Sequence, residues 1–176
     1  AEMPRFGMNV QIPKAYYNVK WYGRGKHENY IDRKNSAFKG IYNSTVSDLG
    51  YDYSRPQENG YRIENRWLQL TNKEGVGFKV YGDPYISFSA HFNTIEDFDD
   101  GLSENEPGQK SSPRSRIVKK QRKPIDVPKR DFISLNIDLK QMGVGGDNSW
   151  GARPLKKYLI QPSSYKYSFI IKPITN

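Results

Sequence analysis

A repeated alternation of apolar and polar residues, with a period of two, constrains the fold of this chain more than any other feature. The alternation is clearest in YISFSAHF (85–92) and FISLNIDL (132–139), and it recurs in GVGFKVYG (75–82) and YKYSFIIK (165–172). Successive side chains of a β-strand point to opposite faces, so each of these segments is expected to be a strand with one apolar face.

Helical periodicity is nearly absent, and only NTIEDFDD (93–100) could form a short turn of helix. YRIENRWLQL (61–70) is expected to be a strand as well, but its apolar residues change parity between Trp67 and Leu68, which indicates a bulge or burial on both faces. Many short strands separated by Gly, Asn, Pro and Asp turns favour an antiparallel β-sandwich over an α/β fold. With 176 residues, we predict a single all-β domain over 1–176.

The net charge of the chain is +9, and most of this excess positive charge lies in one segment. Nine of the 28 basic residues and one of the 19 acidic residues lie within 110–130, which leaves 19 basic and 18 acidic residues elsewhere. An acidic run, 96–106, precedes the basic one, and four prolines follow within 107–128. We interpret about 96–130 as a mobile excursion on a near-neutral domain, so nucleic acid is not an expected partner.

Several classes of site are excluded by composition and spacing. The chain has no cysteine, so it can form neither disulfides nor thiolate metal sites. Its two histidines, His27 and His91, are far apart and lack metal-ligand spacing, so no metal site is expected. No window approaches the roughly 18 apolar residues of a membrane span, and no signal peptide is visible. GVGGDN (143–148) fits neither a dinucleotide fingerprint nor a phosphate loop.

The run QMGVGGDNSWG (141–151) combines four glycines with Trp150. Glycine allows positive φ angles and close approach to a ligand, whereas tryptophan offers a large flat apolar face. This contrast predicts a site, and the alternative is a core tryptophan that follows a glycine turn. Trp21 and Trp67, on strand-like segments, are expected to be core residues.

Four carboxylates in turn-like, aromatic-flanked contexts could form the pair of acids that glycoside hydrolysis requires. No spacing rule selects a pair from them. The structural alternative is that they accept backbone N–H bonds or pair with arginines. The four acids are Glu28, Asp32, Glu58 and Asp147, and the candidate arginines are Arg33, Arg55 and Arg62.

Five motifs together resemble the C-terminal β-sandwich domain of family 2 β-galactosidases, which is similar to the small subunit of two-chain members. The motifs are WYGRGKHENYIDR (21–33), RPQENGYR (55–62), RWLQL (66–70), FSA (88–90) and LNIDLKQMGVGGDNSWG (135–151). The resemblance covers about 3–173 except the basic excursion. Lys26 stands where the family usually has proline, Asn148 replaces the second Asp of GGDDSW, and a histidine-bearing segment after the acidic run is not recognisable.

The resemblance implies a galactose-mutarotase-like supersandwich, of which this chain is an incomplete fragment with an exposed sheet edge. It also implies that the catalytic glutamates, with Mg²⁺ and Na⁺, belong to a preceding TIM-barrel domain, so this chain carries no catalytic residue and no cofactor. Trp150 is then the residue that lines the sugar pocket and stacks on substrate. Asp147 and Asn148 are expected to contact the sugar hydroxyls.

The implied function is the C-terminal domain of a β-galactosidase that hydrolyses terminal β-galactosides with retention, through a covalent galactosyl-glutamate intermediate. Its partners are the β-galactoside and the catalytic barrel domain or large subunit, in a parent that forms homo-oligomers, with no membrane partner. A bacterial source is implied, with cytoplasm and periplasm both open.

Two other classes of function remain open on the sequence. A free-standing carbohydrate-binding module would also use an exposed tryptophan among Gly and Asp, and would bind sugar without any partner. A nucleic-acid-binding domain would use 110–130, and its affinity would fall steeply with salt. Deleting the excursion distinguishes them, because only polyanion binding would be lost.

Overall fold

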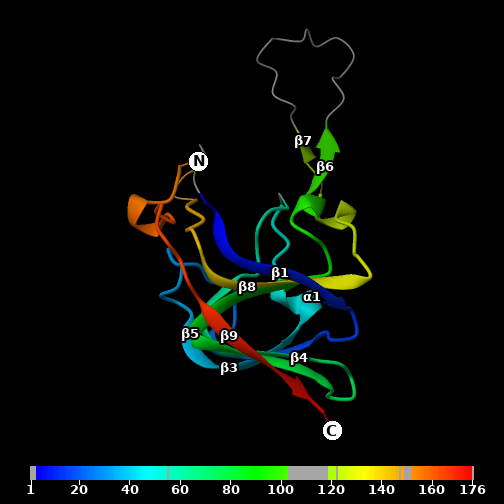
Figure 1. Ribbon diagram of the computed structural model, residues 1–176. Coiled ribbons are helices and arrows are strands. Elements are labelled where there is room, and N and C mark those ends of the chain that lie inside the picture. The colour runs from blue at the N-terminus through cyan, green and yellow to red at the C-terminus, as the bar shows by residue number, and fades with distance from the viewer. Residues whose placement is uncertain are drawn as a thin grey trace.

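The computed structural model describes residues 3–54, 56–102, 119–121, 123–146, 148 and 152–175 (Figure 1). A seven-stranded antiparallel sheet dominates it, with strands in the order β1-β8-β5-β4-β2-β3 and β9 paired to β5. The strands are β1 (Arg5–Pro13), β2 (Asn18–Gly25), β3 (Phe38–Thr45), β4 (Arg62–Thr71), β5 (Gly77–His91), β8 (Phe132–Gln141) and β9 (Ser168–Ile174).

In the part of the chain that the structure describes, helical structure is limited to four short pieces, namely α1 (Val46–Leu49), η1 (Glu96–Phe98), η2 (Pro124–Asp126) and η3 (Lys156–Tyr158). The predicted all-β, antiparallel fold is therefore confirmed. Among the described residues one large sheet forms a single layer, as expected for a fragment of a β-sandwich. Within that part of the chain, no helix is long and apolar enough to cross a membrane.

Strand β5 is the central strand of the sheet, and it merges two segments that the sequence predicts as separate strands. Its first half, 77–83, pairs with β9, and its second half, 87–91, pairs with β8. Pro84 lies between these two registers, where its missing N–H leaves no ladder hydrogen bond unmade. One long strand can therefore carry two different neighbours on the same edge.

Strand β4 contains the bulge that its change of parity indicates. Its pairing with β5 shifts register on both sides of Asn65, whose side-chain amide donates to the carbonyls of Arg62 and Ile86. Beyond the bulge, Leu68 is fully buried in the core. Trp67 points to the opposite, partly exposed face, where the Lys79 ammonium lies 3.8 Å from its ring centre. The core assignment of Trp67 was therefore wrong.

The main core lies on one face of the curved sheet. The central strands supply most of its buried side chains, and α1 packs Val46 and Leu49 onto them. Trp21 is fully buried there, as predicted, and its ring Nε1–H donates to the carbonyl of Arg24. The other core members include Val19, Leu68, Leu70, Val80, Ile86, Phe88, Ala90, Ile133, Leu135 and Ile137.

The charged excursion is described only at its base, where β6 (Asp99–Leu102) and β7 (Lys119–Gln121) form a separate two-stranded sheet. Buried Asp97 pairs with Arg130, whose Nε donates to Oδ2 at 3.0 Å, so an ion pair joins the acidic and basic arms. Residues 103–118 and 122 lie outside the described residues. The predicted mobility of the excursion and the single-domain limits 1–176 therefore stay predictions.

Candidate functional site

Hydrogen bonds to other parts of the chain hold the base of the glycine loop that follows β8, and two of them are donated by its glycines. Gly143 N–H donates to the carbonyl of Tyr158 at 2.8 Å, and Gly145 N–H donates to Oδ2 of Asp32 at 2.8 Å. Gly145 and Gly146 have φ angles of 65° and 90°, a region that side chains disfavour. Glycine is favoured at these two positions because it adopts positive φ without strain, and at Gly143 because an added Cβ would lie 2.5 Å from Asp32 Oδ2.

The three predicted sugar-binding residues lie in the part of the chain that follows this base. Trp150 and Asp147 are outside the described residues, so their contacts stay predictions. Asn148 is described and exposed, and its Oδ1 accepts a hydrogen bond from Ala152 N–H at 3.3 Å. This contact links the two ends of the segment that carries Trp150. The expected contact between Asn148 and a sugar is likewise untested.

Two tyrosines form a platform beneath the loop. Val144 packs against a buried cluster of Tyr30, Tyr61 and Ile63. The Tyr30 and Tyr61 rings are stacked, with centroids 5.7 Å apart and an interplanar angle of 18°. The guanidinium groups of Arg33 and Arg5 lie over the outer faces, 5.2 Å from the Tyr30 ring centre and 5.5 Å from that of Tyr61. Stacked rings capped by cations give the loop a closely packed floor.

Glu28 has the partners that the structural interpretation of the carboxylates requires. One oxygen accepts from Gly60 N–H at 2.7 Å, and the other accepts from Tyr53 O–H and from the Arg33 guanidinium. It therefore ties the segment around 28 to the turn at 57–61. Asp32, through Gly145, likewise serves to join two segments.

Glu58 belongs to a cluster of two acids around one arginine. Arg5 pairs with Glu58 at 2.9 Å through Nη2 and with fully buried Asp138 at 3.1 Å through Nε. Burial raises the pKa of Asp138 to about 7, against the lowering effect of Arg5 and of the Tyr61 O–H that donates to it. Burial also raises the pKa of Glu58. The Glu58 side chain is 26% exposed whereas Asp138 is fully buried, so a single cation leaves Asp138 as the acid that favours its protonated form.

Sequence reasoning missed Arg5, which lies on a strand outside the quoted motifs, and Asp138, which lies on a strand within the motif 135–151 but was not singled out there. The sequence feature that relates to Asp138 is the glycine at position 7. An added Cβ at Gly7 would lie 2.0 Å from Asp138 Oδ1. That oxygen has no hydrogen-bond partner in the described structure. Glycine at position 7 thus makes room for the buried carboxylate.

The remaining candidates do not join this site as catalytic groups. Arg62 does not pair with a carboxylate but donates to the carbonyls of Leu49, Gly60 and Lys26, and burial lowers its pKa to about 10. Arg55 lies outside the described residues. His27 is exposed and contacts Ser36, and no group of three or more His, Asp or Glu side chains among the described residues could hold a metal ion.

Comparison with known proteins identifies the family. Residues 1–171 match the family described as "Beta galactosidase small chain". The chain is 33% identical over 175 residues to a β-galactosidase of Priestia megaterium, covering 98% of this chain and 15% of that protein. It is 32% identical over 170 residues to a β-galactosidase of Vibrio cholerae, covering 97% of this chain and 14% of the relative.

A β-galactosidase of Lactococcus lactis is also similar, with 29% identity over 179 residues that cover 97% of this chain and 15% of the relative. The chain thus spans only 14–15% of the length of these relatives. The matched family covers nearly the whole chain, as does each relative. This chain therefore belongs to the β-galactosidase small-chain family.

Proposed function

We propose that this chain is the C-terminal portion of a family 2 β-galactosidase and that it completes an active site whose catalytic groups lie in a preceding barrel domain. Membership of the small-chain family supports this, as do curated relatives named β-galactosidase. Those relatives are several times longer than this chain, which is consistent with a separate catalytic portion.

The anchored base of the glycine loop is the observation that carries the proposal. Asp32 and Tyr158 hold Gly145 and Gly143 on the tyrosine platform, so the loop starts from a fixed position. A binding residue is effective when its supporting contacts are formed before the ligand arrives. Trp150 follows five residues after Gly145 in the sequence, so the fixed base is close to it along the chain.

The chemistry assigned to the loop is recognition. An indole ring packs well against the C–H face of a galactose ring, and polar groups beside it accept or donate hydrogen bonds to the hydroxyls. Trp150 takes the first role, and Asp147 and Asn148 take the second. In retaining hydrolysis the reaction itself needs two carboxylates about 5 Å apart, one as nucleophile and one as acid/base.

Those two carboxylates are assigned to the barrel, together with Mg²⁺ and Na⁺. In the part of this chain that the structure describes, the sequence-selected carboxylates are engaged elsewhere: Glu28 and Asp32 hold backbone N–H groups, and Glu58 pairs with Arg5. The chain alone is therefore expected to lack glycosidase activity. The parent protein is expected to form homo-oligomers.

Reconstitution tests this assignment. The chain is produced alone, and also together with the portion of the parent protein that precedes it, and hydrolysis of nitrophenyl β-galactoside is followed. Activity in the mixture, with none from either part alone, is the expected result. Hydrolysis by the isolated chain, or an inactive mixture of two folded parts, would refute the division of roles.

A further inference from the structure

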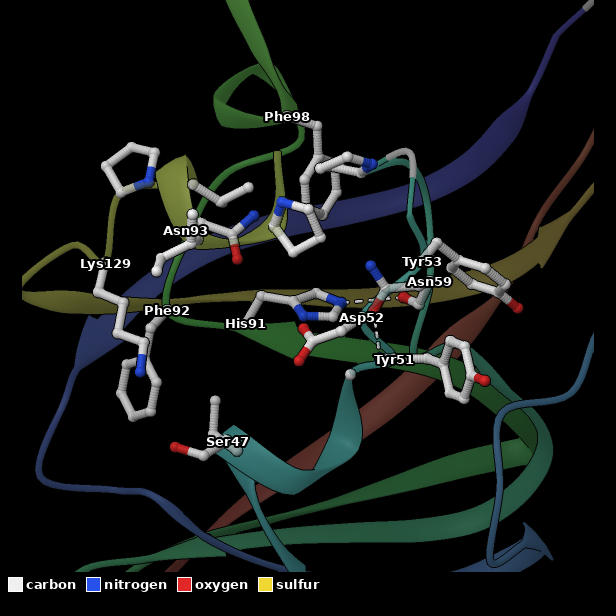
Figure 2. Close-up of a pocket in the computed structure, with 17 residues that line it drawn as sticks. Ser47, Tyr51, Asp52, Tyr53, Asn59, His91, Phe92, Asn93, Phe98 and Lys129 are labelled. Atoms are coloured by element: carbon white, nitrogen blue, oxygen red, sulfur yellow. Dashed lines mark hydrogen bonds between the residues drawn. The ribbon is translucent and has the colours of Figure 1, made fainter. Parts of the chain in front are cut away.

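A cavity lies apart from the glycine loop, between α1, the segment that follows it, the end of β5 and the 124–129 segment (Figure 2). Its volume is about 630 Å³, and all the residues that line it are described. That volume lies within the roughly 300–1,000 Å³ range of small-molecule sites. Pro56 and Asn59 of the motif at 55–62 line it, but no binding role was predicted for either of them.

His91, the last residue of β5, lines this cavity, and of its two ring nitrogens only Nε2 has a hydrogen-bond partner among the described residues. Its Nε2 lies 2.9 Å from the carbonyl oxygen of Asn59, and a carbonyl can only accept, so Nε2 carries the proton (Figure 2). In the neutral ring, Nδ1 then has a free lone pair. Burial, with Arg62 and Arg5 nearby, lowers the pKa of His91 to about 4, so the ring is neutral at pH 7.

The residues beside the His91 ring are a glycine, Gly50, and an asparagine held by hydrogen bonds, Asn59. A Cβ added to Gly50 would lie 3.6 Å from His91 Nδ1, and Gly50 itself lines the cavity. Asn59 is buried and doubly anchored, since its Oδ1 accepts from Tyr51 N–H at 3.0 Å and its Nδ2 donates to the carbonyl of Gln57 at 2.8 Å. The position of the His91 ring is therefore set before any ligand binds.

The rest of the lining combines apolar rings with a few polar groups. Phe92 and Phe98 supply aromatic surface, while Asp52, Asn93 and Lys129 supply a carboxylate, an amide and an ammonium group. One acid and one base give the lining no net charge, which does not favour an ionic ligand. A ligand with flat C–H faces and several hydroxyls matches such a lining. Aromatic rings can pack against the C–H faces, and the polar groups can form hydrogen bonds with the hydroxyls.

Catalysis by His91 is not supported. A general base works best when its pKa is near the operating pH, and a neutral ring with a pKa of about 4 accepts a proton poorly at pH 7. A hydrogen-bond acceptor, by contrast, needs only the lone pair. The described residues around it contain no group that could hold a metal ion.

We propose that this cavity is a second saccharide site, which binds a neutral sugar of one or two rings with His91 Nδ1 as acceptor for a sugar hydroxyl. The site is separate from the loop that carries Trp150 and does not depend on the proposed catalytic role. The turn at 57–61 lies between the two, since Asn59 lines the cavity and Tyr61 packs under Val144.

The test is a titration of the isolated ¹⁵N-labelled chain with galactose and, separately, lactose, followed by NMR. Saturable shifts are expected at His91 Nδ1 and at the backbone amides of the cavity lining, with a dissociation constant on the order of millimolar. In Trp150→Ala the same shifts should persist, because that residue belongs to the other site. Shifts confined to the glycine loop, or no shifts at all, would overturn the proposal.

His91→Gln is the matched variant, because the glutamine amide can still donate to Asn59 but has no atom in place of Nδ1. Its affinity for the sugar should fall about five- to tenfold. His27→Gln, at an exposed histidine outside the cavity, should bind as the wild type does. If His91→Gln does not fold, Asp52→Ala replaces it, since Asp52 is exposed and lines the cavity. Wild-type affinity in whichever of the two variants folds would contradict the site.

Discussion

At the scale of single residues, a few carboxylates hold the loop and its platform together. Asp32 is the most direct example, because its Oδ2 accepts from Gly145 and would lie 2.5 Å from a Cβ added to Gly143. Glu28 does the same for the turn at 57–61 through Gly60. Acids that resemble catalytic candidates in the sequence thus act as acceptors for backbone N–H groups.

Replacing Asp32 by alanine leaves the N–H of Gly145 without its acceptor. We expect the free energy of unfolding to fall by about 1–3 kcal/mol, measured by urea denaturation, and the reconstituted enzyme to lose activity. Asp131→Ala is the control, because that side chain is 83% exposed and pairs only with Lys14 on the surface, so its loss should be below about 1 kcal/mol. Equal losses in the two variants would contradict the role of Asp32.

Asp138 predicts a pH dependence. Its pKa is raised to about 7 in the folded chain but is near 3.8 when unfolded, so between these values the folded state holds a proton that the unfolded state has lost. Its contribution to stability therefore falls as pH rises from about 4 to about 7. Asp138→Asn removes this loss, so the variant should gain about 2–4 kcal/mol relative to the wild type across that window.

Unfolding of both proteins at several pH values measures this difference. His91, whose pKa is lowered to about 4, has the opposite slope in nearly the same range, because its unfolded state binds the extra proton. It contributes equally to both proteins and cancels in the comparison. A difference that stays constant or shrinks with rising pH would show that Asp138 is ionised in the folded chain.

At the scale of elements, alternation in the sequence predicted the strands that became β5, β8 and β9, but it identified neither β1, β2 and β3 nor which segments join into one strand. The segments 75–82 and 85–92 form one strand because β8 and β9 both pair with it, a contact between distant residues that no local pattern contains. In β4 the sequence shows apolar side chains at both Trp67 and Leu68. Only the bulge at Asn65 determines that Leu68 faces the core.

Gly7 tests the pairing of β1 with β8. It lies at the register shift opposite Asp138, where an added Cβ would be 2.0 Å from Oδ1 and 2.6 Å from the Asp138 Cα. Gly7→Ala should therefore lower the free energy of unfolding by about 1–3 kcal/mol in urea denaturation, since backbone must shift. Gly40→Ala on β3 is the control, because an added Cβ there would meet only side-chain atoms of Tyr42 as its nearest contacts, at 3.2–3.3 Å. A smaller loss at position 7 than at position 40 would contradict this account.

At the scale of the whole molecule, segments far apart in the sequence meet beneath the glycine loop. The stretch around Glu28 and Asp32 contacts Gly60 and Gly145, and Tyr61 contacts Asp138 across 77 positions. The sequence predicted the family, the all-β fold and the motifs that take part. It could not predict these contacts, because the motifs specify residue types and only the folded sheet brings their side chains together.

The central claim is that the loop fixed by Asp32 presents Trp150 to a sugar in the active site of the assembled enzyme. The most direct test is kcat/KM for nitrophenyl β-galactoside in the reconstituted enzyme with Trp150→Ala, beside Trp67→Ala as a control at a partly exposed tryptophan on β4. Trp150→Ala should lower kcat/KM about ten- to a hundredfold, and Trp67→Ala should change it less than about twofold. Wild-type kcat/KM in a folded Trp150→Ala enzyme would contradict the claim.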